Sequence, residues 1–201
     1  MIIFCGTSNK GKLREFQQVA RECGGGVELR AVDAPPPEEH GRTFKETAIE
    51  KALYYSRHLG TDSVNYVFAD DSGLEVDALG GAPGVYSARY AGPAADDAAN
   101  NAKLLRALSG IPSGADRRAR YRCVLVYVDG PDDPSPLEAD GTWEGVIVDA
   151  PRGTGGFGYD PYFWLPELGM TAAELDPAEK NRLSHRGLAM RALRARLAAR
   201  P

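Results

Sequence analysis

Residues 66–74 read Tyr66-Val67-Phe68-Ala69-Asp70-Asp71-Ser72-Gly73-Leu74. The run from Val64 to Phe68 is rich in β-forming residues and a glycine follows the two aspartates, which predicts a strand that ends at Asp70 and Asp71. Adjacent like charges repel each other, and a fold tolerates them most readily where a cation lies between them. Carboxylate oxygens at a strand end suit Mg²⁺, and Mg²⁺ suits phosphates. The segment therefore raises the question of whether the chain supplies the rest of a phosphate site.

On the N-terminal side of this segment, the sequence predicts two strands and a helix. The strands are Ile2 to Cys5 and Val27 to Ala31. Between them lie a polar loop, Gly6 to Lys12, and a helix whose apolar residues recur at helical spacing. Gly24 to Gly26 are expected to end that helix.

Further helices and strands follow the same kind of pattern. A capping box at residues 43–46 predicts a helix that runs to about Leu59, and residues 96–108 predict another. The runs 120–128 and 137–148 predict an antiparallel hairpin. No internal repeat or long linker interrupts the chain, so residues 1–201 are expected to form a single domain of two lobes.

Length and composition narrow the class of protein. The chain has 201 residues, of which 43% are hydrophobic, enough for one sizeable domain or two small lobes around a shared core. Its formal net charge of −4 argues against nucleic acid as the main partner. The three cysteines are an odd number, and apolar neighbours around Cys5 and Cys123 predict buried, reduced thiols. The first apolar run is too short for a signal peptide or a membrane span, so we expect a soluble cytoplasmic protein.

Two glycine-rich segments resemble nucleotide-binding motifs, but each lacks a feature that its motif requires. Gly6-x-x-x-x-Gly11-Lys12 is followed by Leu13, where a P-loop needs Ser or Thr for Mg²⁺. The motif still predicts an anion site, because backbone N–H groups at a helix N-terminus and Lys12 both attract phosphate. Residues 153–158 fit G-x-G-x-x-G, but Pro161 soon follows, where a dinucleotide fold needs a helix. That segment is therefore expected to be a loop that carries the ring of Phe157.

Carboxylates and cations elsewhere could complete a phosphate site. Each of these charged residues also has an explanation without function. Glu38 and Glu39 could belong to a solvated loop, the cations could be solvent-facing helix residues, and His185 could make a structural hydrogen bond. If the carboxylates converge, Mg²⁺ would bridge them to phosphate oxygens, and one aspartate would be free to deprotonate an attacking water. The cations that could hold a triphosphate are Lys12, Lys51, Lys180, His185 and Arg186.

The loop from Phe157 to Asp160 could bind a base. Phe157 is flanked by glycines, so a purine could stack on its ring, although an aromatic anchor in the core is the ordinary explanation. Asp160 precedes Pro161 and could accept hydrogen bonds from a base or ribose, or simply cap a turn.

Taken together, the motifs resemble the inosine triphosphate pyrophosphatase family, house-cleaning hydrolases of non-standard purine nucleoside triphosphates. The resemblance covers nearly the whole chain in the expected order, which makes it specific although each motif alone is weak. The motifs are Thr7-Ser8-Asn9-Lys10-Gly11-Lys12, Glu39, Thr43-Phe44, Glu46, Ala48, Lys51, Ala69 to Leu74, Leu79 to Gly84, Tyr86 to Tyr90, Gly155 to Pro161, and Ser184-His185-Arg186-Gly187.

The resemblance implies an α/β fold with a long, curved mixed sheet flanked by helices, and two lobes with the active cleft between them. It implies attack of water at the α-phosphorus of ITP, dITP or XTP, which gives the nucleoside monophosphate and pyrophosphate. It also implies a Mg²⁺ cofactor and a homodimer, while the net charge and the short first apolar run predict no nucleic-acid or membrane partner.

The resemblance also implies roles for individual residues. Asp71 matches the general base, and Lys51 is the second candidate for catalysis. The metal ligands fall on Glu39 and on Asp71 or Asp70, while the choice between Glu38 and Glu39 stays open. Substrate contacts fall on Thr7, Ser8, Asn9, Lys10, Gly11, Lys12, Ser72, Phe157, Gly158, Tyr159, Asp160, Lys180, His185 and Arg186.

Two alternative functions remain at this point. One is a related house-cleaning pyrophosphatase that acts on modified pyrimidine or other nucleotides, which the phosphate loop and the aspartate pair would serve equally well. The Phe157 loop and Ser184 to Gly187 favour purines. The other is a nucleotide-binding regulator without activity, against which the presence of both aspartates, Lys12 and Lys51 argues.

Overall fold

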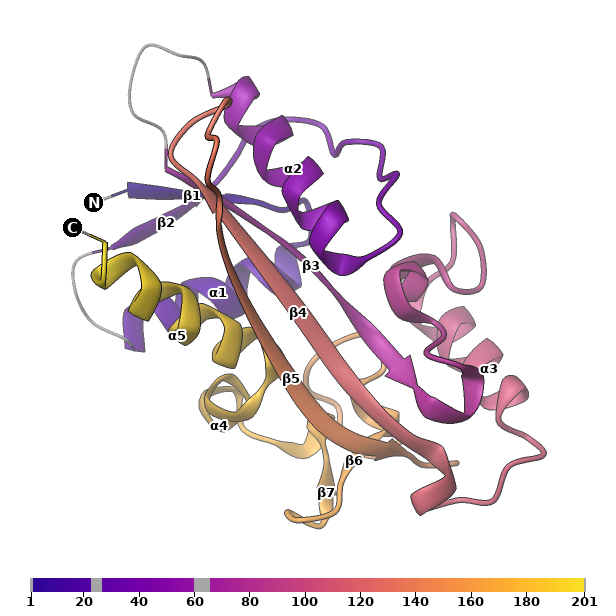
Figure 1. The fold of residues 1–201 in the computed structure, drawn as a ribbon. Helices are drawn as coiled ribbons and strands as arrows, with labels where there is room; N and C mark the ends of the chain where they lie inside the picture. The colour runs from indigo at the N-terminus through magenta and orange to yellow at the C-terminus, as the bar shows by residue number, and fades with distance from the viewer. Residues whose placement is uncertain (1, 23–26, 60–65, 201) are drawn as a thin grey trace. The chain divides into compact units, whose positions relative to one another are not determined.

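In the computed structural model of this chain, the described residues are 2–22, 27–59 and 66–200. Their strands form a seven-stranded sheet in the order β2-β1-β3-β4-β5-β6-β7 (Figure 1). β1 pairs in parallel with β2 and β3, whereas β5 with β6 and β6 with β7 are antiparallel, so the predicted mixed α/β sheet is confirmed. The strands are β1 Ile2–Gly6, β2 Glu28–Ala31, β3 Val67–Val76, β4 Arg118–Val128, β5 Leu137–Ile147, β6 Phe163–Leu165 and β7 Met170–Thr171.

Five α-helices flank the sheet in the described residues: α1 Lys10–Glu22, α2 Phe44–His58, α3 Asp97–Ala107, α4 Pro177–Leu183 and α5 His185–Ala198. The capping box that predicted α2 is present, because the Thr43 side chain accepts from Glu46 N–H and the Glu46 carboxylate accepts from Thr43 N–H. Residues 129–136 join β4 and β5, which are neighbours in the sheet as predicted for the hairpin. Among the described residues, no helix is both long enough and apolar enough to cross a bilayer.

The prediction that a strand ends at the two aspartates is wrong. β3 continues through Asp70, Asp71 and Gly73 to Val76, because Leu74 and Val76 are apolar and fully buried. Gly73 is needed inside the strand rather than at its end. A Cβ at that position would lie 2.4 Å from Ser87 Oγ and 2.5 Å from Gly84 O.

The predicted loop from Gly6 to Lys12 is shorter than expected. α1 begins at Lys10, so Lys10, Gly11 and Lys12 form its first turn and only residues 7–9 lack regular structure. Two other expectations lie outside the described residues: the helix end at Gly24 to Gly26 and the start of the strand at Val64.

The chain divides into two compact units, and it passes from one to the other four times. Unit 1 consists of Met1–Asp71, Cys123–Gly141 and His185–Pro201, and unit 2 of Ser72–Arg122 and Thr142–Ser184. Each has its own hydrophobic core. The core of unit 1 includes Phe16, Phe68, Leu125 and Leu193, whereas that of unit 2 includes Leu74, Leu104, Tyr121, Trp143 and Phe163.

In unit 1, helices cover both faces of the sheet (Figure 1). Successive residues of a strand face opposite sides. Cys5 belongs to the core that includes Phe16 of α1 and Leu193 of α5. The next residue, Gly6, faces α2 so closely that a Cβ would lie 2.5 Å from the Tyr55 ring. This arrangement brings the start of α1 and the middle of α2 to β3, where the aspartates lie.

Candidate active site

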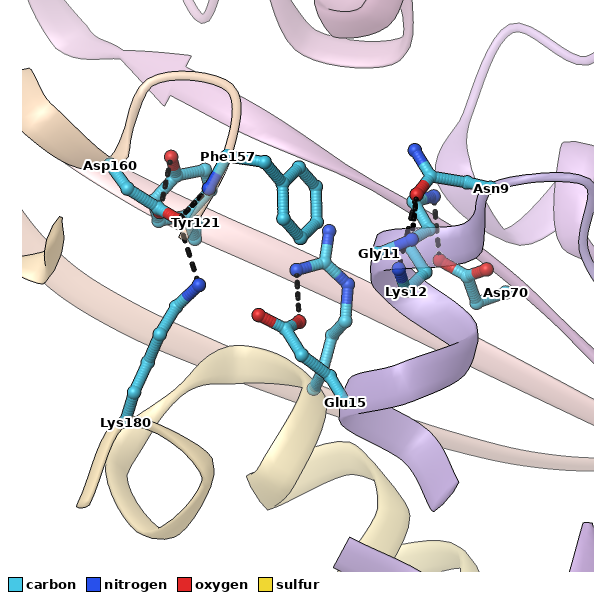
Figure 2. A network of polar contacts seen from close by, with 10 residues as sticks. Asn9, Gly11, Lys12, Glu15, Asp70, Tyr121, Phe157, Asp160 and Lys180 are labelled. Carbon is cyan, nitrogen blue, oxygen red and sulfur yellow. Dashed lines mark hydrogen bonds and ion pairs between the residues drawn. The ribbon is translucent and has the colours of Figure 1, made fainter. Parts of the chain in front are cut away.

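In unit 1, a lysine from α1 binds one of the two aspartates of β3. Lys12 Nζ donates to Asp70 Oδ2 at 2.8 Å. Asn9 Oδ1 accepts from the backbone N–H groups of Gly11 and Lys12 at 2.9 and 3.1 Å and so fixes the first turn of α1 (Figure 2). Since Asn9 takes up these two N–H groups, an anion at this terminus would depend chiefly on the charge of Lys12 and on other donors.

A lysine from α2 lies between the second aspartate and a loop glutamate. Lys51 Nζ is 3.4 Å from Glu39 Oε1 and 3.9 Å from Asp71 Oδ1. Contrary to the ordinary expectation for a helix lysine, Lys51 is buried. The Glu38 side chain is 92% exposed and lies near His40, whereas the Glu39 side chain is 25% exposed. Of the two glutamates, therefore, it is Glu39 that belongs to this cluster.

The two aspartates differ in acidity because their neighbours differ. Burial would raise the pKa of Asp70, but the charges of Lys12, Lys51 and Arg186 outweigh it and lower that pKa to about 2. Burial raises the pKa of Asp71 to about 6, with Asp70 and Glu39 adding to the increase and the two lysines opposing it. Asp71 is thus the carboxylate whose pKa lies nearer to neutral, where a general base works best.

The carboxylates offer a divalent cation fewer ligands than expected. No three His, Cys, Asp or Glu side chains in the described ranges gather into a metal-holding group, so Glu39, Asp70 and Asp71 do not form a three-carboxylate cage. Asp71 Oδ2, however, is buried and has no hydrogen-bond partner among the described residues. Glu39 and Asp71 both lie near Lys51. Because Mg²⁺ commonly takes only one or two protein carboxylates and completes its shell with water and phosphate, Asp71 and Glu39 fit it.

The predicted base-contacting residues at the start of α5 also belong to unit 1. His185 and Arg186 are buried there, and Arg186 Nη1 donates to Glu15 Oε2 of α1 at 2.8 Å. β5 approaches this turn so closely that a Cβ at Gly141 would lie 2.2 Å from His185 O. The charge of Arg186 also acts on Asp70 and helps to lower its pKa.

In unit 2, Asp160 is the centre of a second buried network. Its Oδ1 accepts from Tyr121 Oη at 3.1 Å, and its Oδ2 accepts from Phe157 N–H at 2.8 Å and from Lys180 Nζ at 2.7 Å (Figure 2). Lys180 Nζ also lies 5.2 Å from the centroid of the Phe157 ring, which is half-buried. Asp160 therefore orders the loop internally, which agrees with the turn cap that the sequence offered as the alternative to a contact with base or ribose.

The remaining predicted substrate residues differ in exposure. Thr7 is buried and its Oγ1 accepts from Asn9 N–H at 3.2 Å, while Ser8 and Lys10 are exposed. Tyr159 is buried and its hydroxyl donates to Ser87 O at 2.7 Å. Ser72 lies in β3 and is the first residue of unit 2. The predicted site residues thus form two groups, one in each unit.

Several contributors to these networks were missed by sequence reasoning. Glu15 and Tyr121 each hold a predicted site residue, and Asp97 and Asn101 of α3 bind Gly158 of the Phe157 loop. The sequence held no signal for Tyr121, which looks like an ordinary strand aromatic. For Asp97 and Asn101, the four-residue spacing on a predicted helix was the available signal.

Comparisons with known proteins agree with the motifs. A model of the Ham1 family matches residues 3–196. The dITP/XTP pyrophosphatase of Thioalkalivibrio sulfidiphilus is 51% identical over 203 residues, which cover 100% of both chains. That of Methylococcus capsulatus is 52% identical over 194 residues, or 96% of this chain and 94% of the relative. The solved structure of a HAM1 protein from Coxiella burnetii superposes with a TM-score of 0.87 at 42% identity and covers 100% of both chains.

Proposed function

Because this chain belongs to the Ham1 family, we propose that it hydrolyses non-standard purine nucleoside triphosphates, namely ITP, dITP and XTP, to the nucleoside monophosphate and pyrophosphate. The resemblance inferred from the motifs is confirmed by relatives named dITP/XTP pyrophosphatase. The single observation that carries the proposal is the cluster of two buried aspartates, Asp70 and Asp71, with the buried Lys51 and the partly buried Lys12. Such a cluster combines cations for phosphate oxygens with a carboxylate that can accept a proton.

The phosphates would bind at the start of α1 and beside α2. Lys12 and Lys51 supply positive charge to phosphate oxygens, and Thr7, Ser8, Asn9, Lys10 and Gly11 line the same turn. Asp70 holds Lys12 in place, and its lowered pKa keeps the carboxylate ionised for that role. Lys51 stays charged, because the carboxylates around it outweigh the effect of burial and raise its pKa.

Asp71 would act as the general base. Its carboxylate accepts a proton from the water that attacks the α-phosphorus, and the P–O bond to the pyrophosphate leaving group breaks. The proposed cofactor is Mg²⁺, held by Asp71 and Glu39, and when bound it would neutralise charge on the phosphate oxygens. Lys51 contacts both carboxylates and so fixes their positions.

The base would be read by the Phe157 loop with Ser72, Lys180, His185 and Arg186. Stacking on the Phe157 ring tolerates any purine, so selection has to come from hydrogen bonds. A donor such as Arg186 aimed at a C6 keto oxygen would meet an amino group in ATP. A buried donor left unpaired costs enough to reject that substrate.

The test is to supply the protein with Mg²⁺ and a panel of ITP, dITP, XTP, ATP and GTP and to measure both pyrophosphate and inorganic phosphate. We expect pyrophosphate from the first three and at least tenfold lower kcat/KM for ATP. Release of inorganic phosphate, or no turnover of any purine, would contradict the proposal. Faster turnover of a modified pyrimidine triphosphate would favour the related pyrophosphatase activity instead.

We also propose that two copies associate and that the protein acts in the cytoplasm, where nucleoside triphosphates and reduced thiols occur. An apolar groove of about 1130 Å³ in unit 2, lined among others by Trp143, Trp164 and Leu168, supports association. Leu168→Arg is expected to yield a monomer in light scattering. Leu188→Arg is the matched control, because Leu188 is also 39% exposed but lies on α5 in unit 1. A monomeric unsubstituted protein would contradict this part of the proposal.

A further inference from the structure

The Phe157 loop, residues 153–160, is held by the first half of α3. Gly158 N–H donates to Asp97 Oδ2 at 2.7 Å, and Gly158 O accepts from Asn101 Nδ2 at 2.9 Å. Asp97 and Asn101 are four residues apart, so they share one face of the helix. Both polar backbone groups of a single loop residue are therefore bound by one helix face.

These contacts matter because the ring of Phe157 lies between two glycines. Gly156 and Gly158 have φ of +71° and +66°, a region that few other residues adopt. Glycine is the most flexible residue of a free chain, so such a loop holds a ring in one orientation only if its backbone is bound from outside. Asp160 binds the N–H of Phe157 itself, and the α3 contacts bind the next residue, Gly158.

Asn101 is poorly suited to its place in the helix on grounds of helix stability alone. Asn is a weak helix former, and a buried amide is costly unless its polar atoms are bonded. Asn101 is buried, and its Nδ2 donates both to Asp97 O, at 2.8 Å, and to the loop, while its Oδ1 has no hydrogen-bond partner among the described residues. The side chain therefore joins the first turn of α3 to Gly158.

We infer that Asp97 and Asn101 are positioning residues for base recognition: through Gly158 they set the orientation of the Phe157 ring on which the purine stacks. This inference rests on the proposed function, since it assigns the base end of the same site. Asp97, Asn101 and the Phe157 loop all belong to unit 2, whereas the proposed phosphate-binding residues Lys12 and Lys51 belong to unit 1.

The test compares KM for ITP with the inhibition constant of pyrophosphate in the full-length protein with Mg²⁺. Asn101→Ala and Asp97→Ala are each expected to raise KM for ITP about three- to tenfold, which is the effect of losing one ordering hydrogen bond. The kcat value and the inhibition constant of pyrophosphate, which carries no base, should change less than twofold. Asp97→Asn keeps an oxygen that can accept from Gly158 N–H and is expected to restore the original KM.

The matched control is Asp96→Ala. Asp96 caps the same helix by accepting from Ala99 N–H, whereas Gly158 is bound by Asp97 and Asn101, so loss of the cap lowers the stability of α3 without freeing Gly158. We expect a lower melting temperature with KM for ITP unchanged. An Asp96→Ala variant that raises KM as much as Asn101→Ala would show that α3 acts through stability alone and would overturn the inference.

Failure of this inference can be told apart from failure of the proposed function. If the unsubstituted protein does not turn over any purine triphosphate, the proposed function fails, and the inference is then decided by calorimetric titration with ITP. In that case Asn101→Ala must weaken ITP binding while leaving pyrophosphate binding unchanged. Unchanged ITP affinity, or equal weakening of both ligands, would overturn it. If Asn101→Ala does not fold, Asp97→Ala replaces it in this titration, because Asp97 is an exposed residue.

Discussion

Identical side chains next to each other in this chain have different surroundings. Glu38 faces solvent while its neighbour Glu39 reaches Lys51, and Asp70 binds Lys12 while Asp71 keeps one buried oxygen unbonded in the described structure. The cause is strand and loop geometry, since consecutive side chains of an extended segment point to opposite sides. Chemical identity in the sequence therefore does not imply a shared role.

The two glutamates provide a matched pair for testing the metal site. Glu39→Gln removes a charge near Lys51 and Asp71, so we expect weaker Mg²⁺ binding and at least tenfold lower kcat/KM. Glu38→Gln removes the same charge from an exposed side chain and should change kcat/KM less than twofold. Calorimetric titration with Mg²⁺ and steady-state kinetics would measure both. Equal losses in the two variants would exclude Glu39 as the specific ligand.

Substitution of the proposed base should separate activity from stability. Asp71→Asn is expected to lower kcat by at least about a hundredfold, because it removes general base catalysis, while ITP binding survives. Near-normal kcat would remove Asp71 from that role.

The same variant should be more stable than the unsubstituted protein when metal is absent. The folded-state pKa of Asp71 is raised from 3.8 to about 6, so its ionised form is disfavoured in the fold. Stability from this residue is present below pH 4 and is lost as the pH rises through about 6, whereas asparagine does not titrate. The stabilisation by Asp71→Asn should therefore grow between pH 4 and 7, to roughly 1–3 kcal/mol, in urea unfolding without metal. A difference that shrinks over this range would contradict the assigned pKa.

At the scale of elements, β3 is the strand that carries the two aspartates of the proposed site and also makes a close packing contact. Asp70 and Asp71 are followed by Gly73, which allows Gly84 and Ser87 to approach the strand backbone. Ser87 Oγ accepts from Leu74 N–H at 2.8 Å and donates to Gly84 O at 2.6 Å. The glycine that suggested the end of a strand is thus required for contacts within it.

Gly73→Ala tests this explanation. A methyl group there must displace Ser87 or the backbone at Gly84, so we expect a loss of about 1–3 kcal/mol in the free energy of unfolding. Gly110→Ala is the control, because a Cβ at Gly110 would meet no atom within 4 Å and its φ is not positive. Urea unfolding of both variants would measure the difference. Equal stability of the two would show that Gly73 is not tightly packed.

For the whole molecule, the two units share three continuous strands. β3, β4 and β5 each begin in one unit and end in the other, and each unit buries its own core. Because half a strand cannot unfold without disturbing the backbone of the other half, we expect the units to unfold together.

Two core substitutions and two probes test this cooperativity. Both tryptophans, Trp143 and Trp164, lie in unit 2, so fluorescence reports that unit while circular dichroism reports the whole chain. Leu193→Ala in unit 1 and Leu104→Ala in unit 2 should each cost about 2–5 kcal/mol and shift both signals to the same midpoint. A fluorescence midpoint that ignores Leu193→Ala would show that the units unfold separately.

Much of the fold could be predicted from local patterns. The Thr43 capping box located the start of α2, and alternation with a turn-rich link located β4 and β5, because these signals act between residues close in the chain. The extent of β3 could not be predicted in this way. Gly73 reads as a terminator, and only Ser87, fourteen residues later, explains why it lies within a strand.

Residue types and their order along the chain were enough to identify the family and the chemical groups of the proposed site: two aspartates, the Lys12 turn, Lys51 and the Phe157 loop. Residue type and order are enough for this, because phosphate and metal chemistry need particular side chains. The three-dimensional fold was needed to show that Glu39 rather than Glu38 lies beside Lys51, that Asp70 binds Lys12, and that Asp160 and α3 hold the Phe157 loop. Those assignments depend on burial and on partners distant in sequence, which set both the pKa of a carboxylate and the direction in which a side chain points.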